Sequence, residues 1–175
     1  MADGTFAILM FVAGLADMGF NHCGSGDGCL GRSETTPRLA FSAGQVLERR
    51  ASEAGEIYLR YDLGHKNGPF GHAVGLSLGE HGETWFGVGQ TYDVPVLERS
   101  PFFAELHAMT GVYLDNGGFD LGGPIIFRSG AEVGWENRRG WRFGLSYDHR
   151  SHAGIFGGYN PGIETVQFRV SIPTK

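Results

Sequence analysis

Apolar and polar side chains alternate with a period of two through most of the chain beyond residue 35. In the segment 162–172, every second residue after Glu164 is apolar, from Val166 to Ile172, and the residues between them are polar. The segment 141–151 repeats the pattern, with aromatic and aliphatic residues on one face. Successive side chains of a β-strand point to opposite sides, so this period predicts strands with one apolar and one polar face.

Turn-forming residues divide this part of the chain into segments of strand length. The predicted strands are 37–48, 55–64, 69–80, 84–94, 101–115, 123–135, 139–151 and 162–172. The links at 65–69, 80–83 and 136–140 are rich in Gly, Asn and Pro, which favour chain reversal. Short links join antiparallel neighbours, which predicts an all-β, up-and-down β-barrel of about eight strands over residues 36–175. No 3.6-residue helical period and no internal repeat stands out.

The two faces of the predicted sheet differ strongly in polarity. One face collects Ile57, Leu59, Tyr61, Val74, Leu76, Leu78, Phe102, Leu106, Val112, Ile125, Phe127, Val133 and Trp135. The other collects Arg60, Asp62, Gly71, Gly75, Ser77, Glu105, His107, Arg128, Glu132, Arg142, Asp148 and Arg169. Alternation alone fits a soluble barrel with its apolar face inside or a transmembrane barrel with that face outside.

Two observations favour the transmembrane arrangement. The polar face interleaves both signs of charge with small residues, which can pair and fill the narrow lumen of an eight-stranded barrel. Trp135 and Trp141 flank one short turn, where an interfacial aromatic girdle is expected. The alternative is an aromatic-rich soluble barrel that binds a small apolar ligand.

The overall charge limits the range of partners. The formal net charge is −5, and charged residues make up 19 % of the chain. Since no basic patch is available to neutralise phosphates, the sequence argues against a nucleic-acid partner. The histidines other than His149 and His152 do not cluster like metal ligands, so neither a metal nor a cofactor is expected.

Residues 1–35 form an extension that precedes the predicted barrel. Its longest apolar run, 6–13, resembles the core of a secretory signal, but the start carries Asp3 and no Lys or Arg. We expect the export signal to be already removed; the alternative is a cytosolic chain with a buried N-terminal strand. The run is too short for a typical membrane-spanning helix, and the extension is a candidate surface for a protein partner or a plug.

Cys23 and Cys29 lie close together within the extension, separated by a glycine-rich stretch. In an oxidising compartment they can close a small disulfide loop, and otherwise they are a pair of free thiols. Neither a zinc site nor a phosphate or calcium loop is expected, because the residues that such sites require are missing.

Three residues at the C-terminal end have the types and spacing of a nucleophilic catalytic site. His149 and Ser151 share one strand face, and Glu164 follows on the next antiparallel strand. Ser151 would attack a carbonyl, His149 would carry the proton, and Glu164 would hold the imidazole in one tautomer. On a soluble enzyme such a site would be unusual, because it lies on the apolar face.

At these residues the sequence resembles a known family. The stretch 149–154 reads His-Arg-Ser-His-Ala-Gly, and 160–164 reads Asn-Pro-Gly-Ile-Glu before a final strand that ends in Ser-Ile-Pro. These motifs resemble the lipid A 3-O-deacylase (PagL-like) family, whose eight-stranded outer-membrane barrels carry a Ser-His-Glu triad on the lipid-facing wall. The resemblance implies that His149 is the base, Ser151 the nucleophile and Glu164 the orienting acid. It extends over about 37–172.

The sequence departs from the family pattern at one position, where His152 replaces an Asn after the nucleophile. In the family this Asn and the backbone N–H of a nearby Gly, here Gly154, are taken to form the oxyanion hole. The resemblance therefore assigns His152 and Gly154 to that role. Loss of one such donor can cost about a hundredfold in rate.

The resemblance implies a bacterial outer-membrane esterase that cleaves the 3-O-linked acyl ester of lipid A in the outer leaflet. The alternative is a non-enzymatic outer-membrane barrel that acts as a structural or interaction subunit, with residues 1–35 docking on a partner.

Overall fold

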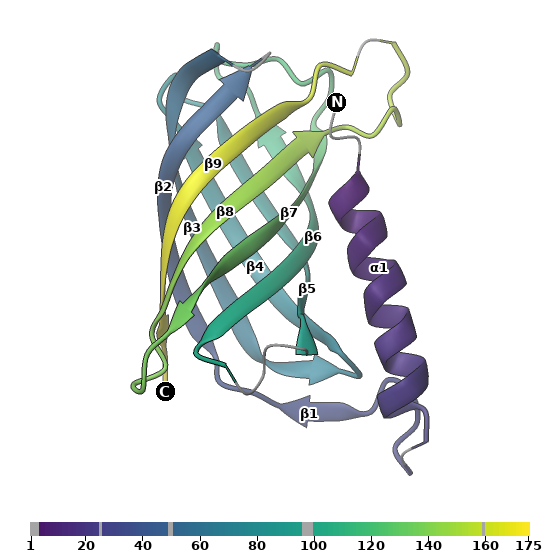
Figure 1. Ribbon diagram of the computed structural model, residues 1–175. Coiled ribbons are helices and arrows are strands. Elements are labelled where there is room, and N and C mark those ends of the chain that lie inside the picture. The colour runs from purple at the N-terminus through teal and green to yellow at the C-terminus, as the bar shows by residue number, and fades with distance from the viewer. Residues whose placement is uncertain (1–3, 25, 49–50, 96–99, 159) are drawn as a thin grey trace.

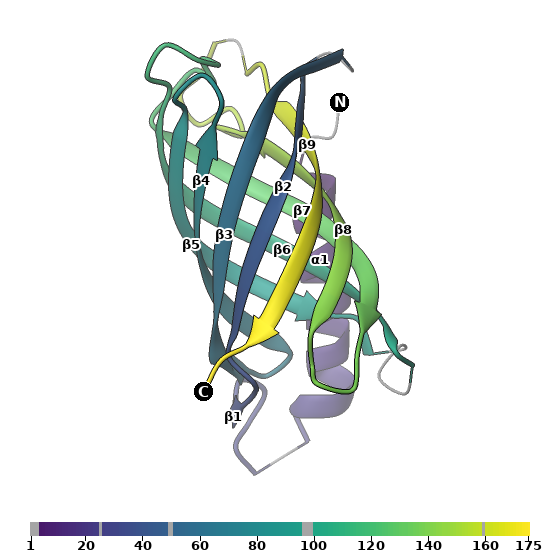
Figure 2. The ribbon, with the colours of Figure 1, turned by 90° about the vertical axis from the view of Figure 1, so that its left-hand side faces the viewer.

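The structure is a computed structural model, which describes residues 4–24, 26–48, 51–95, 100–158 and 160–175. Eight long strands, β2–β9, form a closed antiparallel barrel (Figures 1 and 2). Their bounds are β2 Arg38–Glu48, β3 Ala51–Asn67, β4 Phe70–Gly79, β5 Thr84–Asp93, β6 Phe102–Leu114, β7 Ile125–Glu136, β8 Arg142–Ser151 and β9 Ile163–Pro173. Each strand pairs with its sequence neighbours, and β2 pairs with β9 to close the barrel. The predicted fold class is therefore confirmed.

The strand pairing sets which connections meet at each end. Arg38 lies opposite Pro173, so both ends of the barrel chain meet at what we call the lower end (Figure 1). The opposite, upper end carries the two longest connections, 115–124 and 152–162. The predicted strand ranges differ from the observed ones mainly in β3, which is longer than 55–64, and in β8, which starts at Arg142 rather than 139. The later start follows from the turn at 137–140, where Asn137 accepts hydrogen bonds from the backbone N–H groups of Arg139 and Trp141.

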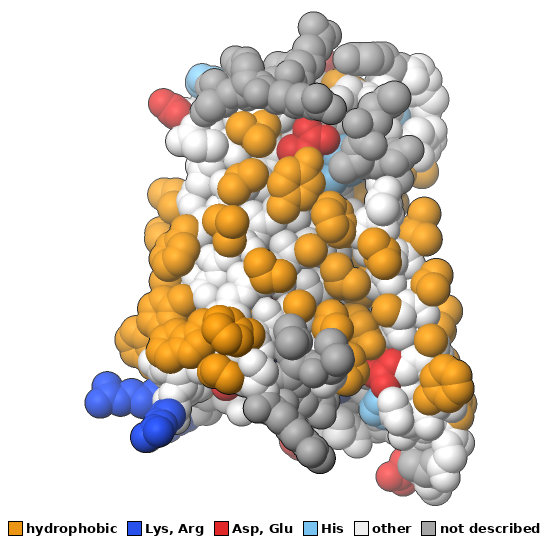
Figure 3. Space-filling view, viewed as in Figure 1, with side chains coloured by type: hydrophobic (Ala, Val, Ile, Leu, Met, Phe, Trp, Pro, Cys, Tyr) orange, Lys and Arg blue, Asp and Glu red, His pale blue; other side chains and the backbone are white. Residues whose placement is uncertain are grey.

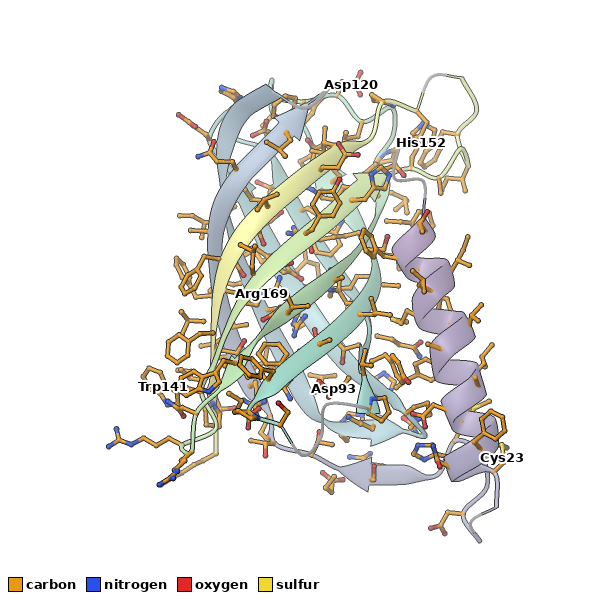
Figure 4. The ribbon with its side chains drawn as sticks, in the orientation of Figure 1. Cys23, Asp93, Asp120, Trp141, His152 and Arg169 are labelled. Carbon is orange, nitrogen blue, oxygen red and sulfur yellow. A yellow bond between two sulfur atoms is a disulfide. The ribbon has the colours of Figure 1, made fainter. Side chains whose placement is uncertain are left out.

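The polar face lines a filled lumen. Arg128 is fully buried and donates hydrogen bonds to Asp148, Glu56 and Gln167. Arg169 is equally buried and donates to Glu132 at 2.6 Å and to Ser42 at 2.8 Å. Figure 4 shows Arg169 inside the barrel. A buried charge is tolerated only when it is paired and hydrogen-bonded. Here the opposite charges are supplied by other strands of the barrel.

The apolar face is on the outside. Apolar side chains cover the outer wall in a broad band between the two ends (Figure 3). Residues in this band include Phe41, Ile57, Leu78, Phe86, Val112, Val133, Leu145 and Phe168, each more than one third exposed. This inverted arrangement is that of a transmembrane barrel and excludes the soluble barrel with an apolar interior. Trp135 and Trp141 are both exposed near the lower end, and each packs against Phe143.

The N-terminal extension is mainly helical. Helix α1, Thr5–Asp17, continues into a π-helical segment η1, Met18–His22, and a short strand β1, Arg32–Glu34, pairs with β3. The alternative of a buried N-terminal strand is therefore wrong. By length and composition Thr5–His22 is apolar enough to cross a membrane, a test that signal sequences also pass. Its apolar residues lie on all sides, so no 3.6-residue period marks it. Cys23 and Cys29 form a disulfide just after η1.

Candidate active site

The upper ends of β8 and β9 bring the three predicted catalytic residues to one place on the outer wall. His149 lies directly opposite Glu164 in the register of these strands, and its Nδ1 is 3.5 Å from Glu164 Oε1. Ser151 follows two residues later on the same strand face, at the last position of β8. His149 and Ser151 are 8 % and 6 % exposed, so the site is sheltered although it is on the outside of the barrel. The arrangement brings a base, a hydroxyl and a carboxylate together, as a hydrolytic triad requires.

The loop after β8 makes a tight turn beside Ser151. Ala153 and Gly154 both have positive φ, which is uncommon for Ala, and the Ala153 backbone N–H donates to Ser151 Oγ at 3.4 Å. The Asn160 side-chain oxygen accepts a hydrogen bond from the His152 backbone N–H at 3.3 Å, which ties the two ends of the loop together. A left-handed non-glycine residue two positions after Ser151 is the kind of backbone strain that clusters at functional sites.

The two residues that the resemblance assigns to the oxyanion hole are bonded to each other. The Gly154 N–H donates to His152 Nδ1 at 3.1 Å, and the His152 ring is fully buried, 5.8 Å from the ring centre of Phe156. Figure 4 shows His152 at the upper end of the barrel, near the start of α1. Their oxyanion role stays a prediction, and it requires this hydrogen bond to break.

A cavity of about 630 Å³ opens beside the triad, between α1 and the outer wall. Ser151 and His149 line it at one side, together with Ala153 and Asn160. The remaining lining is mostly apolar and comes from α1 and the strands β5, β6 and β7. Its volume lies within the range of about 300–1,000 Å³ that is usual for ligand sites.

Sequence reasoning missed two parts of this site. Ser129 on β7 lies directly opposite His149, is 6 % exposed and lines the same cavity. It is a polar residue on the otherwise apolar outer face of β7, and this irregularity could have revealed it. The helix α1 was missed as well, and it supplies the outer wall of the cavity. Among the residues that the structure describes, no group of His, Cys, Asp and Glu side chains is arranged to hold a metal ion.

A family model for lipid A 3-O-deacylase (PagL) matches residues 54–173, which is more than half of the chain. The chain belongs to the PagL family. The match contains β4–β9 with most of β3, and His149, Ser151 and Glu164 lie within it.

Solved structures share the PagL-type fold. The crystal structure of the outer membrane enzyme PagL is 18 % identical, with a TM-score of 0.58, over 78 % of this chain and 99 % of that one. A de novo designed transmembrane β-barrel gives a TM-score of 0.59 at 10 % identity, over 81 % of this chain and 98 % of that one. Neisserial surface protein A gives 0.53 at 13 % identity, over 82 % and 99 %. At these identities the likeness shows the fold alone. No curated protein matches the sequence significantly.

Proposed function

We propose that this PagL-family protein is an outer-membrane esterase that removes the 3-O-linked acyl chain from lipid A. The observation that carries the proposal is the placement of His149, Ser151 and Glu164 together on the lipid-facing wall, at the side of an apolar cavity. A lipid substrate in the outer leaflet reaches such a site by lateral diffusion, without leaving the bilayer. The upper end, with its two longest connections, then faces the cell exterior, as is usual for these barrels.

The proposed chemistry proceeds through an acyl-enzyme. Ser151 Oγ attacks the ester carbonyl while His149 takes its proton, and the tetrahedral intermediate then expels the sugar oxygen, which receives that proton. Water, activated by His149, next attacks the acyl-serine ester and releases a free 3-hydroxy fatty acid. Glu164 stabilises the imidazolium that forms in each half of the reaction.

In this proposal two donors on the cavity side stabilise the oxyanion. The Ala153 N–H points toward Ser151 Oγ, and Asn160 lines the cavity beside it. Because the Asn160 oxygen accepts from the His152 N–H, its amide NH₂ is the group that remains to donate. In this proposal His152 acts as a positioning residue, since its ring holds the Gly154 N–H and shapes the turn.

The test is release of 3-hydroxy fatty acid from lipid A by the purified protein in detergent, measured by gas chromatography and mass spectrometry. Wild type is expected to release it, and Ser151→Ala is expected to abolish release. Ser33→Ala, an exposed change on β1 at the lower end, controls for handling. Loss of activity in Ser129→Ala but not in Ser151→Ala would identify Ser129, on the other side of His149, as the nucleophile instead.

The second candidate function is a non-enzymatic barrel that binds a protein partner through the N-terminal extension. The outward face of α1 favours it, because Ile8, Leu9, Val12 and Leu15 are each at least half exposed. Absence of release from wild type, where a known deacylase is active, together with stable co-purification of a second outer-membrane protein, would support this function instead.

A further inference from the structure

Helix α1 is packed on the outside of the barrel over β5, β6 and β7 (Figures 1 and 2). Met10 is completely buried in a cluster with Phe70 and Tyr92. Phe11 lies 6.2 Å from the Phe70 ring, and Phe6 lies 5.8 Å from the Tyr147 ring. The helix is therefore in contact with the wall along one line, from Tyr147 on β8 to Phe70 on β4.

This line of contact is one row of the barrel register. Tyr92 pairs with Leu106, Leu106 with Ala131, and Ala131 with Tyr147, so outward-facing residues at one level follow each other across neighbouring strands. The helix approaches the wall closely at Gly14, where a Cβ atom would overlap the Phe70 ring. This position therefore needs a residue without a side chain. The row forms a closed lower border between α1 and the wall.

The two rows above it form the floor of the cavity. Gln90, Ala108, Ser129 and His149 are paired in succession, and so are Val88, Thr110, Phe127 and Ser151. All eight residues line the cavity, and Gly4 together with Ala7, Ile8 and Phe11 of α1 covers it from outside. The cavity is thus a slot that runs across four strands, with the proposed nucleophile at the β8 end.

We propose that α1 and these two rows form an acyl-chain groove that sets the length of the chain removed at Ser151. This rests on the proposed function in one respect, since it takes Ser151 as the point of attack. The mainly apolar lining fits a hydrocarbon tail, whose carbonyl end meets the polar groups beside Ser151. Ala7 stands over the groove, and Phe11, which also contacts Phe70 on β4, closes its far end.

The register gives the length of the preferred chain. Neighbouring strands are about 4.8 Å apart, so the path from β8 to β5 is about 14 Å. An extended chain advances about 1.2 Å per bond, as a polypeptide does over its three bonds per residue. The groove therefore fits a straight chain of about twelve carbon atoms.

The first test measures kcat/KM for p-nitrophenyl esters with acyl chains of four to sixteen carbons, using the full chain in detergent. In wild type each methylene up to about twelve carbons is expected to raise kcat/KM about fourfold, the equivalent of ~0.8 kcal/mol per buried CH₂. Ala7→Trp should lower kcat/KM at least tenfold for the twelve-carbon ester and less than twofold for the four-carbon ester. Phe11→Ala should shift the optimum to longer chains.

The matched control is Val12→Trp, which adds the same side chain on the face of α1 that points away from the barrel, where Val12 is 63 % exposed. Its chain-length profile should equal that of wild type. A profile unchanged by both Ala7→Trp and Phe11→Ala, or equally reduced for short and long esters, would overturn the groove. The groove would also be overturned if mass spectrometry of the protein extracted from membranes showed that residues 4–11 are absent.

A second measurement separates failure of the groove from failure of the proposed function. Should no ester show hydrolysis that depends on Ser151, a diazirine-labelled dodecanoic acid is cross-linked to Ser151→Ala protein in lipid nanodiscs. Labelling of Phe11 and Phe127 that unlabelled dodecanoic acid competes away supports the groove without any catalysis. Labelling no stronger there than on Val12 and Leu15, and not competed, rejects it.

Discussion

The contact between His149 and Glu164 makes a quantitative prediction for Glu164→Gln. At 3.5 Å, a carboxylate and an imidazolium attract each other by about 1 kcal/mol in bulk water and by about 5 kcal/mol at an effective dielectric constant near 20. The two side chains are 11 % and 20 % exposed, so the larger value applies more closely. Since 1.36 kcal/mol is a factor of ten in rate, we expect kcat/KM to fall by about 10³–10⁴.

The assay is release of 3-hydroxy fatty acid from lipid A at several substrate concentrations, with the fold of each variant checked by heat-dependent migration of the barrel on gels. Glu80→Gln is the control, because Glu80 is a carboxylate at the same end of the barrel, where its side chain accepts a hydrogen bond from the backbone N–H of Gly55. That variant should keep wild-type activity. A folded Glu164→Gln protein that loses less than about fivefold would refute the role of Glu164 in stabilising the imidazolium.

Three further predictions concern the barrel and its helix. Arg128→Met should lower the free energy of unfolding by about 3–5 kcal/mol, measured by denaturant titration in detergent, because Asp148 is left buried without its main partner; a loss below about 1 kcal/mol would contradict the pairing. Phe168→Arg should cost about 2–4 kcal/mol in lipid vesicles, since this side chain is 57 % exposed on the apolar band; an unchanged stability would mean that β9 does not face lipid there. Gly14→Leu should release α1 from the wall and expose it to protease, whereas Gly19→Leu, with open space around it, should not; equal protection of both variants would refute the docking.

The sequence alone was sufficient to predict the barrel strands, because alternation is a local property. A strand such as β9 shows its two faces through Val166, Phe168 and Val170 on one side and Gln167 and Arg169 on the other. The shared position of His149, Ser151 and Glu164 on one face was also predictable, since residues two apart share a face and Glu164 lies near the start of the next strand. The motif around Ser151 then added the family.

Alternation could not show which face of the sheet points outward, because the strands of a soluble barrel and of a transmembrane barrel have the same alternating pattern. It was decided by closure of the sheet, which places Arg128 and Arg169 inside the barrel beside carboxylates from other strands. The hydrogen bond between His152 and Gly154 depends likewise on the conformation of a turn with two positive φ angles.

The position of the helix and the shape of the groove also depend on the tertiary structure. A helix shows an amphipathic pattern when one side contacts an apolar environment and the other a polar one. Helix α1 packs on the apolar barrel wall and also carries apolar residues on its exposed side, so its sequence has no such pattern. The groove combines α1 with residues from β5, β6, β7 and β8 that are far apart in the chain. Sequence determined the strands and the chemical groups, whereas strand register and helix docking decided what those groups surround.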